Sequence, residues 1–189
     1  MTTIAIAGCA HIHMPNFAKK LAERAQARGD VRVARVWDPD AGRARNYAGQ
    51  LGAAVADDVA DVWKDQQIEA VVICSETSLH EALVMPAAAN GKHLFVEKPL
   101  GMGATDAWRM ARAIEKAGVI FQTGYFQRSV PIHLFLRDEI RKGSFGRVTR
   151  LRASMCHAGS FNGWFDTDYR WMADLEAAGC GAFGDLGTH

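Results

Sequence analysis

The stretch IAIAGCAHIH at residues 4–13 indicates the fold class of this chain. Its first four residues are apolar on both faces, which is typical of a strand covered by helices on both sides. Gly8 ends this run, and a segment of helical periodicity follows, with Phe17, Leu21 and Ala25 on one face. A buried strand that leads through small residues into a helix predicts the first strand–helix unit of an α/β sheet.

The alternation of apolar runs and helical segments continues to about residue 124. Runs of strand length occur at residues 4–7, 31–37, 70–74, 93–96 and 119–122. The helical stretches end at common stop signals, namely Gly29, Asn90-Gly91 and Gly118. The sequence therefore predicts a doubly wound parallel sheet with five strands and right-handed crossovers.

The pattern changes after Gly124. A helix that begins at Pro131 presents Ile132, Phe135, Leu136 and Ile140 on one face. Residues 147–154 alternate polar and apolar, which predicts a strand with one solvated face. We therefore expect a dinucleotide-binding domain at residues 1–124 and the incomplete beginning of a second α+β domain at residues 125–189.

The composition is that of a folded globular protein. Of the 189 residues, 49% are hydrophobic and 23% are charged, and the net charge is +1. This excludes a disordered chain, and it argues against general binding to nucleic acid or to anionic membranes. Residues 128–152 contain seven Arg or Lys, which we interpret as a solvated face rather than a nucleic-acid site.

The termini and the cysteines indicate a cytoplasmic protein. Residues 1–7 carry no export signal, and no apolar stretch is long enough to span a membrane. Four cysteines are scattered along the chain without ligand-like spacing, so we expect neither a metal site nor a disulfide framework. Two of them, Cys9 and Cys74, lie beside apolar runs and are predicted to be small buried thiols.

Ligands of a doubly wound sheet bind at the carboxyl ends of its strands. After the first strand, Gly8 and Ala10 fit a pyrophosphate-binding loop, although His13 stands where a third small residue is expected. After the second strand, Asp38 either accepts the ribose hydroxyls of an adenosine or opens a turn with Pro39. The Asp38 carboxylate would repel a 2′-phosphate and therefore favours NAD over NADP. Arg43, a few residues further on, leaves NADP as the alternative.

Polar residues follow the third and fourth of the expected strands as well. Ser75 and Thr77 either meet the cofactor's ribose or cap the next helix, and His80 is either structural or directed at the cofactor. Glu97 and Lys98 place opposite charges at the mouth of the cleft, unless they form only a surface salt bridge. Pro99 fixes the backbone there, and a cis bond would turn Lys98 inward.

Two motifs resemble the Gfo/Idh/MocA oxidoreductases. These are GKHLFVEKPL at residues 91–100 and GCGAFGDLGTH at residues 179–189, which occur in the family's order and at its separation. The chain departs from the family pattern at Ala10, His13 and Cys180. The resemblance implies hydride transfer between NAD and a secondary alcohol or ketone of a sugar or cyclitol.

The resemblance also implies catalytic roles. Asp185 and His189 share a helix face, and their spacing alone fits a helix N-cap pair as well as a catalytic pair. In the family pattern His189 is the acid or base, Lys98 is the cation on the reacting oxygen, and Asp185 orients its partner. His189 and Lys98 either share or exchange the proton-transfer role.

The substrate site is expected beyond the sheet, where most aromatic residues are interpreted as packing. The candidate substrate contacts are Tyr125, Arg128, Tyr169 and Arg170. Family members are considerably longer, with a second domain that recognises substrate and pairs with another subunit. We therefore expect a fragment of a protein that forms a homo-oligomer at full length. The alternative is a catalytically silent NAD(P)-binding module that serves as a redox sensor or assembly subunit.

Overall fold

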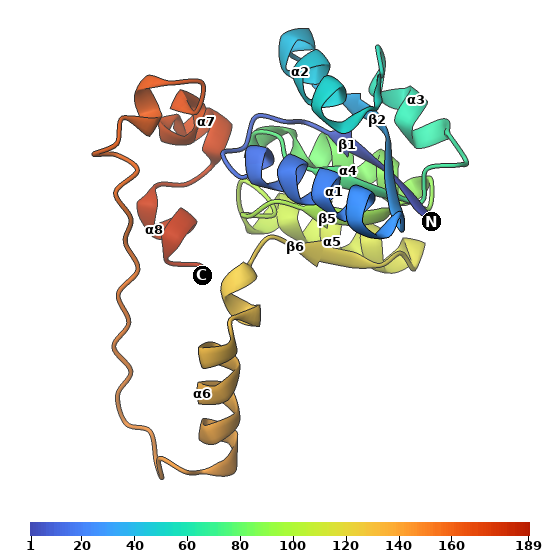
Figure 1. Cartoon of the computed structure of the whole chain (residues 1–189). Helices are drawn as coiled ribbons and strands as arrows, with labels where there is room; N and C mark the ends of the chain where they lie inside the picture. The colour runs from blue at the N-terminus through green and yellow to red at the C-terminus, as the bar shows by residue number, and fades with distance from the viewer.

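The protein contains one parallel sheet with helices on both faces, followed by an extended arm (Figure 1). The computed structural model describes residues 1–189. The strands lie side by side in the order β3-β2-β1-β4-β5-β6. Their bounds are β1 Thr2–Ala7, β2 Val31–Trp37, β3 Ala54–Val55, β4 Ala70–Ile73, β5 His93–Val96 and β6 Phe121–Thr123.

Eight α-helices and four short 3-10 helices connect and follow the strands. The α-helices are α1 Met14–Arg28, α2 Ala41–Leu51, α3 Val59–Lys64, α4 His80–Ala89, α5 Ala104–Ala117, α6 Pro131–Lys142, α7 Leu175–Ala178 and α8 Ala182–Leu186. The 3-10 helices are η1 Thr77–Leu79, η2 Phe126–Ser129, η3 Trp164–Asp166 and η4 Arg170–Ala173. None of the helices is both long and apolar enough to cross a bilayer.

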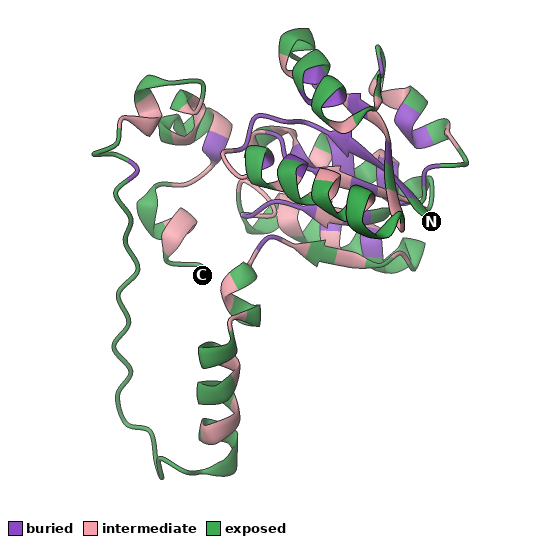
Figure 2. Cartoon of the chain, viewed as in Figure 1, coloured by how far each residue is buried: buried purple, intermediate pink, exposed green.

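The two faces of β1 explain why its sequence is continuously apolar. Ile4 and Ile6 pack with Met14 of α1 and other residues on one side of the sheet. Ala5 and Ala7 pack into a second core that includes residues of α3, α4 and α5. Buried residues therefore concentrate in the sheet and the helices against it (Figure 2). The predicted doubly wound α/β fold is confirmed.

The predicted strands are present with small changes at their ends. The sheet also contains β3, a sixth strand that the sequence analysis missed because it has only two residues. The predicted burial of Cys9 and Cys74 is confirmed, whereas Cys156 is exposed and Cys180 is half-buried.

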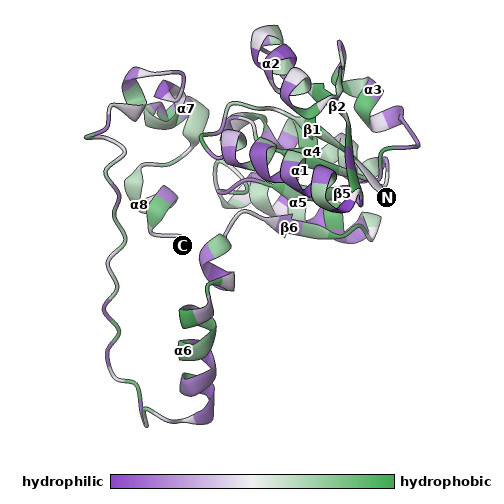
Figure 3. Cartoon of the chain, in the orientation of Figure 1, coloured by the Kyte–Doolittle hydropathy of each residue, from purple (hydrophilic) through white to green (hydrophobic).

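The strand predicted at residues 147–154 is wrong. This segment has no regular secondary structure and is exposed throughout, along the arm that returns from α6 to α7 (Figures 1 and 2). A strand needs a neighbour for its backbone hydrogen bonds, and no strand of this chain lies beside the segment. The apolar face predicted for α6 is present but uncovered, with Ile132 and Phe135 more than half exposed (Figure 3).

Candidate active site at the carboxyl edge of the sheet

The loops after β1, β2, β4 and β5 meet at one edge of the sheet, and the segment with α7 and α8 lies against this edge (Figure 1). All six strands are parallel, so the polar residues that follow them in the sequence are brought together in space. Most of the residues predicted from the sequence lie here.

Gly8 is required by the loop after β1. Its φ angle is +86°, in the left-handed region that favours glycine. A Cβ atom at this position would lie 2.3 Å from Cβ of Ser75 on the loop after β4. The absence of a side chain therefore lets the two loops approach each other. Ser75 itself is buried, and its hydroxyl donates to the carbonyl of Glu76 at 3.0 Å.

The loop after β1 has the donors that a pyrophosphate needs. The backbone N–H groups of Ala10 and Ile12 donate to no group of the protein. His13 is the N-cap residue of α1, and its side chain makes no capping hydrogen bond there. Unpaired N–H groups at the start of a helix attract anions. These residues fit the phosphates of a dinucleotide, even with His13 at the third position.

Asp38 supports this loop from the end of β2. Its side chain is buried and accepts hydrogen bonds from the backbone N–H of Cys9 at 2.6 Å and of Asp40 at 2.7 Å. Arg43 donates to the same carboxylate at 3.1 Å. Asp38 therefore joins the loops after β1 and β2, in addition to any contact with a ribose.

Thr77 and His80 differ in what they can offer a ligand. Thr77 is buried and lines a small cavity beside Lys98. The Nδ1 atom of His80 lies 3.1 Å from each of the carbonyl oxygens of Pro99 and Leu100. Burial lowers the pKa of His80, so its ring is neutral and donates from Nδ1 to these carbonyls. These contacts favour the structural role for His80.

Glu97 is paired with His13 and not with the ammonium group of Lys98. Glu97 Oε1 lies 3.0 Å from His13 Nδ1, and Oε2 accepts the backbone N–H of Lys98 at 2.9 Å. The carboxylate is buried, so the surface salt bridge considered from the sequence does not occur. Burial acts to raise the pKa of Glu97, but the hydrogen bond with His13 and nearby charges leave it below its ordinary value.

The side chain of Lys98 forms an ion pair with Asp185 of α8. Lys98 is buried, and the Lys98–Pro99 peptide bond is cis. Both charged groups line a cavity of about 20 Å³ together with His11, Thr77 and Trp171. The carboxylate expected to orient His189 is thus bonded to the lysine, 87 residues away in the chain.

His189 lines a different and larger cavity, with a volume of about 870 Å³, which is also lined by Phe183 and Leu186 of α8. Its ring lies 5.6 Å from that of Tyr125 and 5.2 Å from that of Phe126. Burial, and then the charge of Lys98, lower the pKa of His189. Its Nδ1 atom is buried without a hydrogen-bond partner. Arg128 lines the same cavity.

The other two substrate candidates lie elsewhere. Arg170 is exposed on η4, and neither Tyr169 nor Arg170 lines the cavity of His189. Tyr169 lies near Tyr47 of α2: burial, and then the neighbouring phenol, raise the pKa of Tyr47 to about 12. Trp171, interpreted from the sequence as packing, instead donates from its indole N–H to the carbonyl of Ala10 at 3.1 Å.

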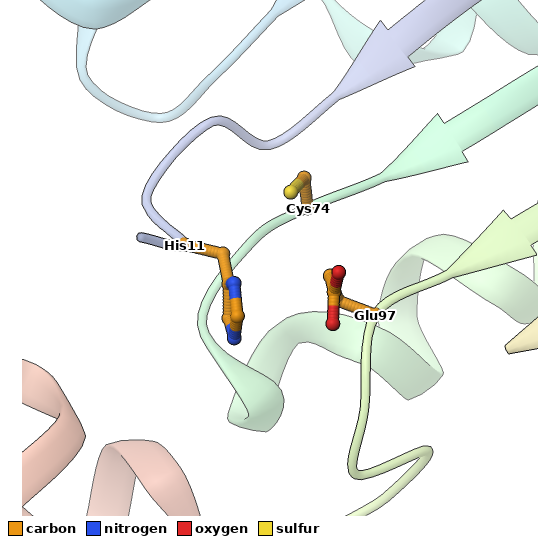
Figure 4. A group of neighbouring side chains, drawn as sticks. All are labelled: His11, Cys74 and Glu97. Carbon is orange, nitrogen blue, oxygen red and sulfur yellow. The ribbon is translucent and has the colours of Figure 1, made fainter. Parts of the chain in front are cut away.

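His11, Cys74 and Glu97 converge from the loops after three neighbouring strands (Figure 4). Their potential ligand atoms lie within 4.8 Å of one another. Burial lowers the pKa of His11 to about 3 and raises that of Cys74, so imidazole and thiol are both neutral. The one charged group, Glu97, already accepts from His13 and from the Lys98 N–H. The charge of Glu97 is thus compensated by hydrogen bonds without a metal ion. The absence of a metal site stays a prediction.

Comparison with known proteins decides the family. Residues 2–125 match the family model described as "Oxidoreductase family, NAD-binding Rossmann fold" (GFO_IDH_MocA). The chain belongs to the Gfo/Idh/MocA family. This confirms the family that the sequence resembles; the match includes the motif at residues 91–100, and the matched part of the family is NAD-binding.

Three similar members illustrate the family. The chain is 35% identical over 113 residues to scyllo-inositol 2-dehydrogenase (NAD(+)) of Bacillus subtilis (strain 168), covering 59% of this chain and 33% of that protein. It is 32% identical over 160 residues to the rhizopine catabolism protein MocA of Rhizobium meliloti, covering 84% and 47%. A crystal structure of an NAD binding oxidoreductase from Klebsiella pneumoniae superposes with a TM-score of 0.71 at 26% identity, covering 100% and 50%. The chain thus spans a third to a half of these Gfo/Idh/MocA proteins.

Sequence reasoning missed three contributors to the site of this Gfo/Idh/MocA protein. They are His11, Glu76 and Trp171, each of which contacts or approaches a predicted site residue. The signal that could have identified His11 and Glu76 is their position, because each follows the carboxyl end of a strand by three or four residues. Trp171 was considered among the aromatic residues and interpreted as packing, because nothing in the sequence indicates a bond to Ala10, 161 residues away.

Proposed function

We propose that this protein is an NAD-dependent dehydrogenase or reductase that acts on a secondary alcohol or ketone of a sugar or cyclitol. The observation that carries the proposal is the ion pair between the buried Lys98 and the partly exposed Asp185, at the carboxyl edge of an NAD-binding sheet. Burying a lysine with a single carboxylate partner costs free energy, and a buried ionisable group in a cleft is therefore a candidate for a functional role. The dehydrogenase and oxidoreductase names of the relatives support the same reaction class.

The cofactor would be held by the loops described above. The N–H groups of Ala10 and Ile12 would bind the phosphates, and Asp38 and Thr77 would lie along the ribose positions. When bound, the nicotinamide ring supplies the hydride acceptor or donor. The protein has to supply positive charge at the reacting oxygen and a group that exchanges the hydroxyl proton.

Lys98 is suited to the reacting oxygen. Its ammonium group is buried and is fixed by Asp185, and a positive charge in a buried position stabilises a developing alkoxide more strongly than in water. We assign Asp185 to positioning Lys98 rather than His189. This differs from the family expectation only in the partner that Asp185 holds.

His189 is suited to accept or return the proton. Its depressed pKa keeps the ring neutral at physiological pH, and its unpartnered Nδ1 offers a site for a hydroxyl proton. His189 and Lys98 line different cavities in this structure, so both act on one substrate only when its reacting carbon is within reach of both side chains. Arg128 and Tyr125, which lie beside His189, are the substrate contacts we favour.

We propose residues 1–124 as the cofactor-binding domain and residues 125–189 as the beginning of a substrate domain. The uncovered apolar face of α6 supports this, because such a face is normally buried against another unit. We propose that the full-length protein is a cytoplasmic homo-oligomer. The buried free thiols Cys9 and Cys74 fit a reducing compartment.

The test is a turnover assay with the full-length protein. NAD and a panel of inositols and sugars are added, and formation of reduced nicotinamide is followed by absorbance. We expect turnover with at least one polyol. Binding of NADH with no turnover of any polyol or of the corresponding ketones would instead identify the catalytically silent module.

A further inference from the structure

Arg43 lies between two carboxylates that come from different loops. It belongs to the first turn of α2, and its guanidinium contacts Asp38 at 3.0 Å and Glu76 at 3.2 Å. Asp38 follows β2 and Glu76 follows β4, and these two strands lie on either side of β1. Arg43 therefore forms a bridge between the two loops that flank the loop after β1. Asp38 is where the ribose of an adenosine is expected, so the bridge lies at the adenosine end of the cofactor site.

The two carboxylates are used differently. Asp38 is completely buried and already binds the backbone N–H groups of Cys9 and Asp40, so the loops depend on it. Glu76 binds only Arg43, through Oε1, and its Oε2 atom is buried without a partner. A buried acceptor without a donor costs free energy, so Glu76 is held there at some cost to the fold. The Glu76 side chain makes no hydrogen bond to the backbone of either loop, and its charge acts on Arg43.

The net charge of the group formed by Arg43, Asp38 and Glu76 affects which nucleotide can bind beside it. One guanidinium faces two carboxylates, so the group carries an excess negative charge. A free ribose brings no charge of its own to this group. A 2′-phosphate has no donor to offer, and it brings about two further negative charges into a partly buried site. Arginine alone would favour that phosphate through paired hydrogen bonds.

We propose that Glu76 is a specificity residue that selects NAD against NADP by holding Arg43 against Asp38. This rests on the proposed function, in which the loop after β1 binds a nicotinamide dinucleotide. With Asp38 as its only carboxylate partner, Arg43 would have N–H groups left over to bind a 2′-phosphate, so we infer that Asp38 alone does not set this selection. The presence of Arg43 is thus compatible with NAD, since Glu76 neutralises it.

The experiment measures binding by the full-length protein, not turnover. Dissociation constants of NADH and NADPH are obtained from nicotinamide fluorescence, and those of 5′-AMP and 2′,5′-ADP from calorimetry. The substitution Glu76→Gln retains the shape of the side chain and removes its charge. We expect the ratio of the NADPH to the NADH dissociation constant to fall about tenfold or more, with a parallel gain for 2′,5′-ADP.

Two controls keep the result interpretable. Glu115→Gln removes the same charge from an exposed position on α5 and should leave the ratio as in the wild type. Adding Arg43→Leu to Glu76→Gln should abolish the gain for NADPH, because the guanidinium is then absent. Thermal unfolding confirms that each variant is folded.

The outcomes separate this inference from the function on which it rests. If the wild type binds neither NADH nor NADPH, the proposed function is wrong and the inference falls with it. If the wild type binds NADH and Glu76→Gln leaves the ratio unchanged, or weakens both nucleotides equally, only the inference is overturned. A gain for NADPH that persists without Arg43 would overturn it as well.

Discussion

The indole N–H of Trp171 donates a hydrogen bond to the backbone carbonyl of Ala10, across a distance of 3.1 Å. Ala10 lies in the loop that we propose binds the cofactor's phosphates, and Trp171 belongs to the segment that carries Asp185 and His189. The two halves of the candidate site are therefore joined at the loop after β1. Trp171 also lies 6.0 Å, ring to ring, from His11.

Trp171→Phe should weaken NADH binding by about two- to tenfold, the effect of one lost hydrogen bond. The ring and its packing against His11 are retained, while the Ala10 carbonyl loses its donor. The measurement is a fluorescence titration with NADH. Trp108→Phe changes an exposed tryptophan on α5 and serves as the control. Equal affinities for Trp171→Phe and the wild type would show that this link does not support the loop.

Lys98→Met should lower kcat by a factor of about 100 or more while NADH still binds. The apolar side chain has a similar length but leaves no positive charge at the reacting oxygen, and it releases Asp185. Steady-state kinetics and NADH titration together give the answer. Comparable turnover in this variant would remove Lys98 from the mechanism.

Gly8→Ala should destabilise the fold by about 3 kcal/mol or more. The φ angle of +86° disfavours any side chain, and the new Cβ would overlap Ser75. Urea unfolding provides the free energy. Gly49→Ala is the matched control, because a Cβ at that exposed position in α2 meets nothing within 4 Å. Helix propensity predicts that this control gains about 0.5 to 1 kcal/mol. Similar losses in both variants would contradict the prediction.

His11 should make the stability of the protein depend on pH. Burial lowers its pKa to about 3, against about 6.5 when unfolded, so the unfolded state binds the extra proton first. Its contribution is complete above pH 6.5 and is lost as the pH falls toward 3. Between pH 7 and pH 4, the wild type should lose about 3 kcal/mol more stability than His11→Gln.

The control for this experiment is His133→Gln, since His133 is exposed on α6. Urea unfolding at several pH values shows whether the difference appears. Parallel curves for the wild type and His11→Gln would mean that the imidazole is protonated in the folded protein or is not buried.

The sequence was sufficient for the sheet because its signals are local. A strand buried on both faces has to be apolar throughout, and a helix that ends before the next strand tends to end at glycine, as at Gly29 and Gly118. The two-residue strand β3 carries too few residues for any periodicity. Residues 147–154 show why alternation alone is insufficient, since a strand also requires a partner.

By itself the sequence determined the fold class, the edge of the sheet where ligands bind, and most of the polar residues found there. Parallel strands deliver the residues after their carboxyl ends to one edge, whatever the details of packing. Only the tertiary structure decided which of these residues are paired. Asp185 bonds to Lys98 and not to His189, Glu97 to His13 and not to the Lys98 ammonium, and Arg43 to two carboxylates. Side-chain pairing depends on distances between loops that are remote in the chain, and no local pattern records those distances.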